Sequence, residues 1–149
     1  MGILANLTDE IKNAMRAKDS LRLEALRAIK SAVMLEQTSS AAGTQLTDEQ
    51  EVKLVQKLVK QRKDSAQIFR EQNRPDLVEP EEAQAKIIAE FLPTQLSVEE
   101  ITKIVGDIIA QTAAAGMKDM GKVMGMVSKQ LAGQADGKTI SGIVRKNLV

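Results

Sequence analysis

Apolar residues recur every three to four positions along most of the chain, which is the spacing of an amphipathic helix. The clearest run follows the i, i+3, i+4, i+7, i+8 pattern at Ile101, Ile104, Val105, Ile108 and Ile109. No stretch alternates between apolar and polar residues as a strand would. The pattern therefore predicts an all-α, multihelical protein.

Four helices are expected before the last of the three prolines, Pro93. The third opens on a capping box, Thr47-Asp48-Glu49-Gln50, and should end near Asn73 because Arg74-Pro75 disfavours helical backbone. The segment from Thr38 to Leu46 is rich in small polar residues and is expected to be a mobile loop. The predicted helices cover residues 4–15, 20–36, 47–73 and 81–92.

A domain boundary is expected shortly after Pro93. Ser97-Val98-Glu99-Glu100 has the sequence of a second capping box and should begin a new helix. Asp119 is expected to cap the following helix, and Asp136 or Thr139 the last one. We therefore predict an N-terminal helical region, residues 1–96, followed by a three-helix unit, residues 97–149.

Composition excludes much familiar chemistry. The chain contains no Cys and no His, so thiolate or imidazole metal sites, Ser-His-Asp triads and disulfides are ruled out. Trp and Tyr are also absent, which rules out an aromatic platform for stacking bases, and Phe69 and Phe91 are both expected in the core. No apolar run approaches the roughly 20 residues of a membrane span. We expect a cytoplasmic protein that binds no metal, cofactor or membrane.

Positive charge gathers near the C-terminus. From residue 112 onward there are six Lys or Arg and two Asp or Glu, whereas residues 1–96 carry fourteen basic and fifteen acidic residues. In the same region Gly121 and Gly125 are expected inside a helix, where each costs about 1 kcal/mol relative to Ala. Two interpretations explain these glycines: close packing of another helix, or close approach of a sugar-phosphate backbone neutralised by Lys122 and Lys129.

The predicted third helix carries a row of basic residues on one face. The row consists of Lys60, Lys63, Arg70 and Arg74, spaced 3, 7 and 4 residues apart. Such a row is suited to following phosphates. The alternative is an ordinary solvated helix face that Asp64 and Glu71 partly neutralise.

Five motifs, taken together and in order, resemble the GatB/YqeY family. They are Lys60-Gln61-Arg62-Lys63-Asp64-Ser65, Arg74-Pro75-Asp76-Leu77, Phe91-Leu92-Pro93-Thr94-Gln95-Leu96, Asp119-Met120-Gly121-Lys122-Val123-Met124-Gly125 and Gly133-Gln134-Ala135-Asp136-Gly137. The chain looks like a stand-alone YqeY-like protein. The resemblance implies an all-helical fold related to the helical and tail regions of the amidotransferase B subunit, whose tail contacts tRNA.

The leading functional prediction is a non-catalytic module that binds tRNA or aminoacyl-tRNA complexes by shape and backbone. The alternatives are an accessory subunit of a glutamine-dependent, tRNA-dependent amidotransferase and a protein-interaction adaptor with a partner in translation. No residue is predicted to be catalytic. The candidate RNA-binding residues are Lys118, Gly121, Lys122, Gly125, Lys129, Gly133, Ala135, Lys138, Lys60, Lys63, Arg70 and Arg74.

Overall fold

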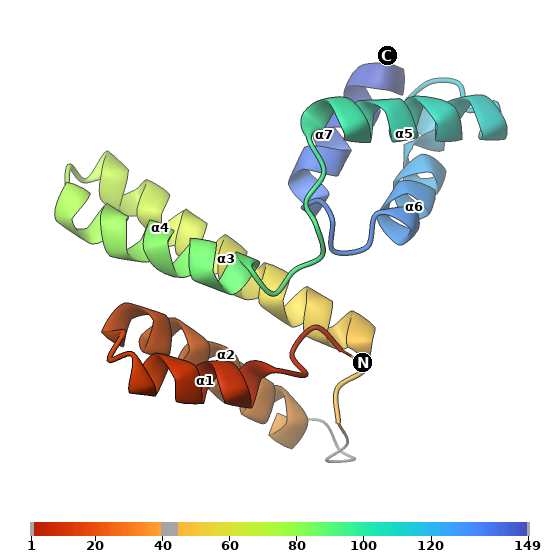
Figure 1. Ribbon diagram of the computed structural model, residues 1–149. Coiled ribbons are helices and arrows are strands. Elements are labelled where there is room, and N and C mark those ends of the chain that lie inside the picture. The colour runs from red at the N-terminus through yellow and green to blue at the C-terminus, as the bar shows by residue number, and fades with distance from the viewer. Residues whose placement is uncertain (1, 40–44, 149) are drawn as a thin grey trace. The chain divides into compact units, whose positions relative to one another are not determined.

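The computed structural model describes residues 2–39 and 45–148 and contains only helices, turns and loops within these ranges (Figure 1). This confirms the predicted all-α fold. The helices are α1 (Leu7–Arg16), α2 (Ser20–Ser39), α3 (Asp48–Glu71), α4 (Pro75–Ala89), α5 (Val98–Thr112), the 3-10 turn η1 (Met117–Asp119), α6 (Met120–Gln130) and α7 (Gly137–Leu148).

The chain divides into two compact units, Met1–Pro93 and Thr94–Val149, called here the N-terminal and the C-terminal unit. The C-terminal unit begins three residues before the expected boundary because hydrogen bonds hold the connecting segment to it. The side-chain Nε2 of Gln95 donates to the carbonyl of Gly133 at 2.7 Å, and the amide of Leu96 donates to the carbonyl of Gln134 at 3.0 Å.

The capping box at α3 is confirmed. The Thr47 hydroxyl accepts from the amide of Gln50, and the Gln50 side chain accepts from the amide of Thr47 in return. At α5 the Ser97 hydroxyl accepts from the amide of Glu100 but donates to the Glu100 carboxylate instead of leaving it for the Ser97 amide. The second capping box is therefore only half formed.

The expected start of α4 is wrong by six residues. The helix begins at Pro75, a favourable residue for the first turn because its missing N–H has no partner to lose there. Pro80 lies inside the same helix. The carbonyl that the missing amide would have bonded belongs to Asp76, which is exposed, so water can satisfy it. Pro80 consequently does not mark a helix start.

Two further sequence-based assignments need correction. α2 continues to Ser39, past the expected end, and the hydroxyls of Thr38 and Ser39 donate to carbonyls one turn back. Most of the expected loop, residues 40–44, lies outside the described residues. Asp119 makes no side-chain cap at α6, because its carboxylate accepts from the amide of Ala115 instead. Asp136 does cap α7, since its carboxylate accepts from the amide of Thr139 at 2.7 Å.

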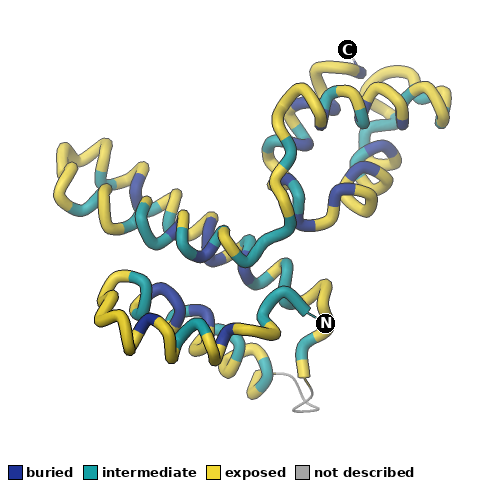
Figure 2. The backbone as a smooth tube through the Cα atoms, viewed as in Figure 1, coloured by how far each residue is buried: buried dark blue, intermediate teal, exposed yellow. Residues whose placement is uncertain are grey.

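Each unit has a hydrophobic core of its own, and the buried positions recur at helical spacing (Figure 2). In the N-terminal unit the α1–α2 and α3–α4 hairpins meet around Leu26, Ile29, Val55 and Ile88. The two phenylalanines are only half-buried, which corrects the expectation that both are core residues. In the C-terminal unit α5, α6 and α7 enclose a core made of Ile101, Val105, Ile108, Val123, Val127, Leu131, Ala135, Ile140, Ile143, Val144 and Leu148.

Candidate functional site

The glycine–lysine motif lies on α6, with one face to the core and the other to solvent. Val123 and Val127 are fully buried, whereas Gly121, Lys122, Gly125 and Lys129 are all exposed. At 3.6 residues per turn these four positions fall within an arc of about 100°. We call this surface the α6 face. Its two lysines are separated by about 10 Å along the helix axis.

The glycines of the α6 face are not needed for packing within the described residues. A Cβ atom added to Gly121 or Gly125 would have no neighbouring atom within 4 Å. Among the two interpretations of the motif, close packing of another helix of this chain therefore finds no support in the described residues. Alanine would fit at both positions and would make α6 more stable.

The basic residues around the α6 face have no acidic partners. In the described part of the C-terminal unit, no Lys or Arg side chain forms an ion pair. Lys118, in η1, and Lys138, near the start of α7, are exposed as well. Unpaired surface ammonium groups keep their full charge available to an anionic ligand, because no carboxylate competes for them.

Two of the candidate RNA-binding residues lie inside the C-terminal unit. Gly133 is buried in the turn after α6 with a φ of 78°, a left-handed conformation that favours glycine, and its carbonyl accepts from Gln95. Ala135 is a member of the hydrophobic core. Both residues therefore shape the turn that joins α6 to α7, and neither forms part of the α6 face.

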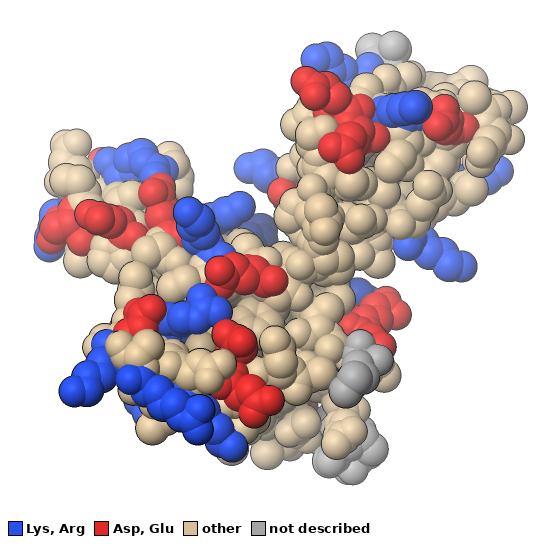
Figure 3. Space-filling model, in the orientation of Figure 1, with Lys and Arg blue, Asp and Glu red and all other residues tan. Residues whose placement is uncertain are grey.

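The basic row of α3 belongs to the N-terminal unit and is mostly paired with carboxylates. Lys60 contacts Asp64 at 3.0 Å, and Arg70 pairs with Glu82 of α4. Arg74 donates from Nε and Nη2 to the two carboxylate oxygens of Asp76, which holds the pKa of Asp76 below its usual value. Within residues 45–93, Lys63 alone of the four has no ion-pair partner. The visible face of this unit accordingly shows basic and acidic side chains interspersed (Figure 3).

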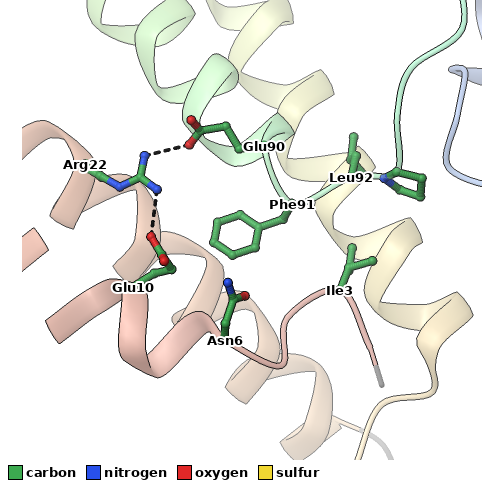
Figure 4. Close-up of a pocket in the computed structure, with 8 residues that line it drawn as sticks. Ile3, Asn6, Glu10, Arg22, Glu90, Phe91 and Leu92 are labelled. Atoms are coloured by element: carbon green, nitrogen blue, oxygen red, sulfur yellow. Dashed lines mark hydrogen bonds and ion pairs between the residues drawn. The ribbon is translucent and has the colours of Figure 1, made fainter. Parts of the chain in front are cut away.

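The N-terminal unit also contains a polar pocket that sequence reasoning did not find (Figure 4). Arg22 of α2 donates to Glu10 of α1 at 3.0 Å and to Glu90, just after α4, at 2.7 Å. These hydrogen bonds, the one to Glu90 first, raise the pKa of Arg22. The pocket, about 410 Å³, includes Phe91 and Asn6. The only signal in the sequence would have been an arginine among the apolar positions of α2.

Comparison with known proteins identifies the family. A family model described as "Yqey-like protein" matches residues 4–148. The chain belongs to this YqeY-like family. The family predicted from the five motifs is thus confirmed over almost the whole length.

The relatives of this YqeY-like chain include two groups of proteins. One is "Altered inheritance of mitochondria protein 41, mitochondrial", whose Pyrenophora tritici-repentis member is 32% identical over 89% of this chain and 73% of the relative. The other is a subunit of "Glutamyl-tRNA(Gln) amidotransferase". The Thermococcus gammatolerans protein is 37% identical over 46% of this chain, and the Thermococcus sibiricus protein is 29% identical over 91% of it. This chain spans 12% and 21% of those two proteins.

The structure adds one observation on membranes and one on metals. No helix among the described residues is long and apolar enough to cross a membrane. In the same residues, no group of three or more acidic side chains is arranged to hold a metal ion.

Proposed function

We propose that this YqeY-like protein binds tRNA through the α6 face, without catalysing a reaction itself. The observation that carries the proposal is the pair of exposed glycines flanked by unpaired lysines on one helix face. A duplex or loop backbone can approach the helix closely where side chains are absent, and the ammonium groups then neutralise phosphates. The relationship to a subunit of an amidotransferase named for Glu-tRNA(Gln) supports tRNA as the nucleic acid.

The α6 face contributes most of this binding, together with Lys118 and Lys138. The basic row of α3 contributes less, because Lys60, Arg70 and Arg74 must leave a carboxylate before they neutralise a phosphate. Recognition depends on shape and charge, since the chain has no Trp or Tyr to stack on bases. The expected affinity therefore depends strongly on salt and only weakly on base sequence.

The test is the fluorescence anisotropy of labelled bulk tRNA, measured over a series of salt concentrations. Each phosphate contact adds about 0.7 to 0.9 to the slope of log affinity against log salt, so Lys122→Gln with Lys129→Gln should lower the slope by nearly 2. The matched control, Lys12→Gln with Lys30→Gln, removes two exposed lysines of the N-terminal unit and should leave the slope unchanged. Absence of wild-type binding at low salt, or an equal loss in the control, would reject the proposal.

The second candidate function is that of an accessory subunit in a tRNA-dependent amidotransferase. The amidotransferase proteins among the relatives favour it, although this chain spans only about a fifth or less of those proteins. Purified chain added to a catalytic amidotransferase should then raise the rate of tRNA amidation. Stimulation that disappears with Lys122→Gln and Lys129→Gln would unite the two candidates, whereas no stimulation would remove this one.

The cytoplasm is the compartment we propose from the sequence. The fungal relatives are mitochondrial by name, which makes a matrix location the competing assignment. Fluorescence microscopy of the tagged chain in its own cells distinguishes the two.

A further inference from the structure

A groove of about 460 Å³ runs between α5 and α7 in the C-terminal unit, away from the α6 face. Val98 and Thr102 line it from α5. Gly142 and Ile143 line it from α7, with Lys138 and Lys146 at positions four residues before and after the glycine. The three α7 positions 138, 142 and 146 share one side of the helix, because residues four apart lie one above the other.

The groove is apolar at its base and charged only on one rim. Val98 is 62% exposed, which is unusual for a β-branched apolar residue, and it lies near Ile143 of the core. Lys138 and Lys146 are exposed and form no ion pair within the described residues, and no carboxylate among them lines the groove. An occupant that covers the groove must therefore bring apolar surface together with negative charge.

The remaining polar groups of the groove are already used. The Thr102 hydroxyl donates to the carbonyl of Val98, and the Asn147 amide donates to the carbonyl of Ile143. The Thr139 hydroxyl donates to Asp136. These bonds leave the two ammonium groups as the ready polar contacts, so a sugar or an uncharged polar ligand would find few partners there.

Gly142 opens the middle of the groove. A Cβ atom at this position would meet nothing within 4 Å, although glycine inside α7 costs about 1 kcal/mol relative to Ala. The missing side chain allows a backbone or a small side chain to cross α7 closely at this point. The lysine stems on either side are about 12 Å apart along the axis, which suits acidic groups at both ends of an apolar stretch.

We propose that the α5–α7 groove docks an acidic amphipathic helix of a partner protein. Its apolar face covers Val98 and Ile143, its closest approach is over Gly142, and acidic residues seven or eight positions apart reach Lys138 and Lys146. An RNA backbone supplies the negative charge but has no apolar group for Val98, so the observations favour a peptide. The proposal is independent of tRNA binding by the α6 face.

The experiment uses the full-length protein as bait for a phage-displayed library of 16-residue helix-forming peptides with random acidic, basic, polar and apolar positions. Enriched peptides are then synthesised, labelled and titrated by fluorescence anisotropy. The expected peptides carry acidic residues on both sides of an apolar stretch. Lys138→Glu with Lys146→Glu, and separately Gly142→Leu, should each weaken their binding by about tenfold or more.

Two matched variants control for charge and for helix substitution. Lys103→Glu reverses an exposed lysine of α5 outside the groove lining, and Gly125→Leu fills the α6 face, so both should bind the peptides like the wild type. Circular dichroism checks that every variant is folded. No enrichment, peptides without acidic residues, or equal binding to the groove variants would overturn the proposal. Lost tRNA affinity in the groove variants with unchanged peptide affinity would also overturn it.

Discussion

Glycine at an exposed helix position sacrifices stability unless something approaches its backbone. Gly121 and Gly125 show this trade on α6, and Gly106 shows the same open surroundings on α5. Because a Cβ atom is tolerated at all three, alanine there tests function separately from fold. The lysines add the second half of the argument, since charge that no carboxylate neutralises within the described part of the unit remains available to a partner.

Gly121→Ala with Gly125→Ala should stabilise the protein and weaken tRNA binding. Each substitution adds about 0.5 to 1 kcal/mol through helix propensity, and the new methyl groups hold the RNA backbone away from α6. Chemical denaturation followed by circular dichroism measures the first effect, and anisotropy with labelled tRNA measures the second.

Gly106→Ala is the matched control for this pair. It should add about the same stability per site without changing tRNA affinity, because Gly106 lies on α5 and outside the α6 face. If the α6 double variant gains stability and keeps its full tRNA affinity, close backbone approach is not the reason for the glycines.

At the scale of elements, caps and cross-helix contacts decide where each helix begins and how it is held. The carboxylate of Asp136 accepts from both the amide and the hydroxyl of Thr139, with distances of 2.7 and 2.8 Å. Arg22 works across elements instead, since it joins α2 to Glu10 of α1 and to Glu90 after α4. Neither contact follows from helical periodicity, because both depend on a side chain meeting a specific polar group.

Asp136→Ala should destabilise the C-terminal unit by about 1 kcal/mol, the usual cost of removing an N-cap side chain. Urea denaturation monitored by the helical circular dichroism signal gives the change in unfolding free energy. Asp136→Asn keeps an acceptor for the Thr139 amide and should recover most of the loss. Equal losses in the two variants would show that the negative charge, and not the cap, is what matters.

Arg22→Met should lower the free energy of unfolding of the N-terminal unit by about 1 kcal/mol. Methionine keeps much of the apolar stem, so the change removes chiefly two hydrogen-bonded ion pairs of a side chain that is 28% exposed. Urea denaturation provides the measurement. Lys60→Met removes a pair whose partners are 72% and 60% exposed and should cost less than about 0.5 kcal/mol. A cost for Arg22→Met no larger than that would contradict the role of Arg22 as a link between elements.

At the scale of the whole molecule, two units with separate cores share one chain. The core of the C-terminal unit is built from residues 101–148, with Leu96 packed against it, and the proposed tRNA contacts and peptide groove both lie within the same unit. The N-terminal unit has balanced, mostly paired charge on α3 and a core of its own between the two helical hairpins.

The fragment 94–149 should therefore fold alone and retain most of the tRNA affinity, while the fragment 1–93 should bind tRNA weakly. Circular dichroism with thermal melting tests folding, and the anisotropy titration tests binding. A domain of this size buries limited surface, so a lower melting temperature than that of the full chain is expected. Retention of tRNA affinity by 1–93 instead would move the binding surface to the N-terminal unit.

The sequence by itself determined the helical fold, the capping box at Thr47, the core stripe of α5 and the family, because these depend on local spacing and on residue identity. It misplaced the start of α4 and the role of Asp119, since a proline or an acid near a helix end is compatible with several local geometries. Only the tertiary structure decided which surfaces are open. Burial of Gly133 and Ala135, pairing of Arg70 with Glu82 and the empty space over Gly121, Gly125 and Gly142 all depend on neighbours from other elements.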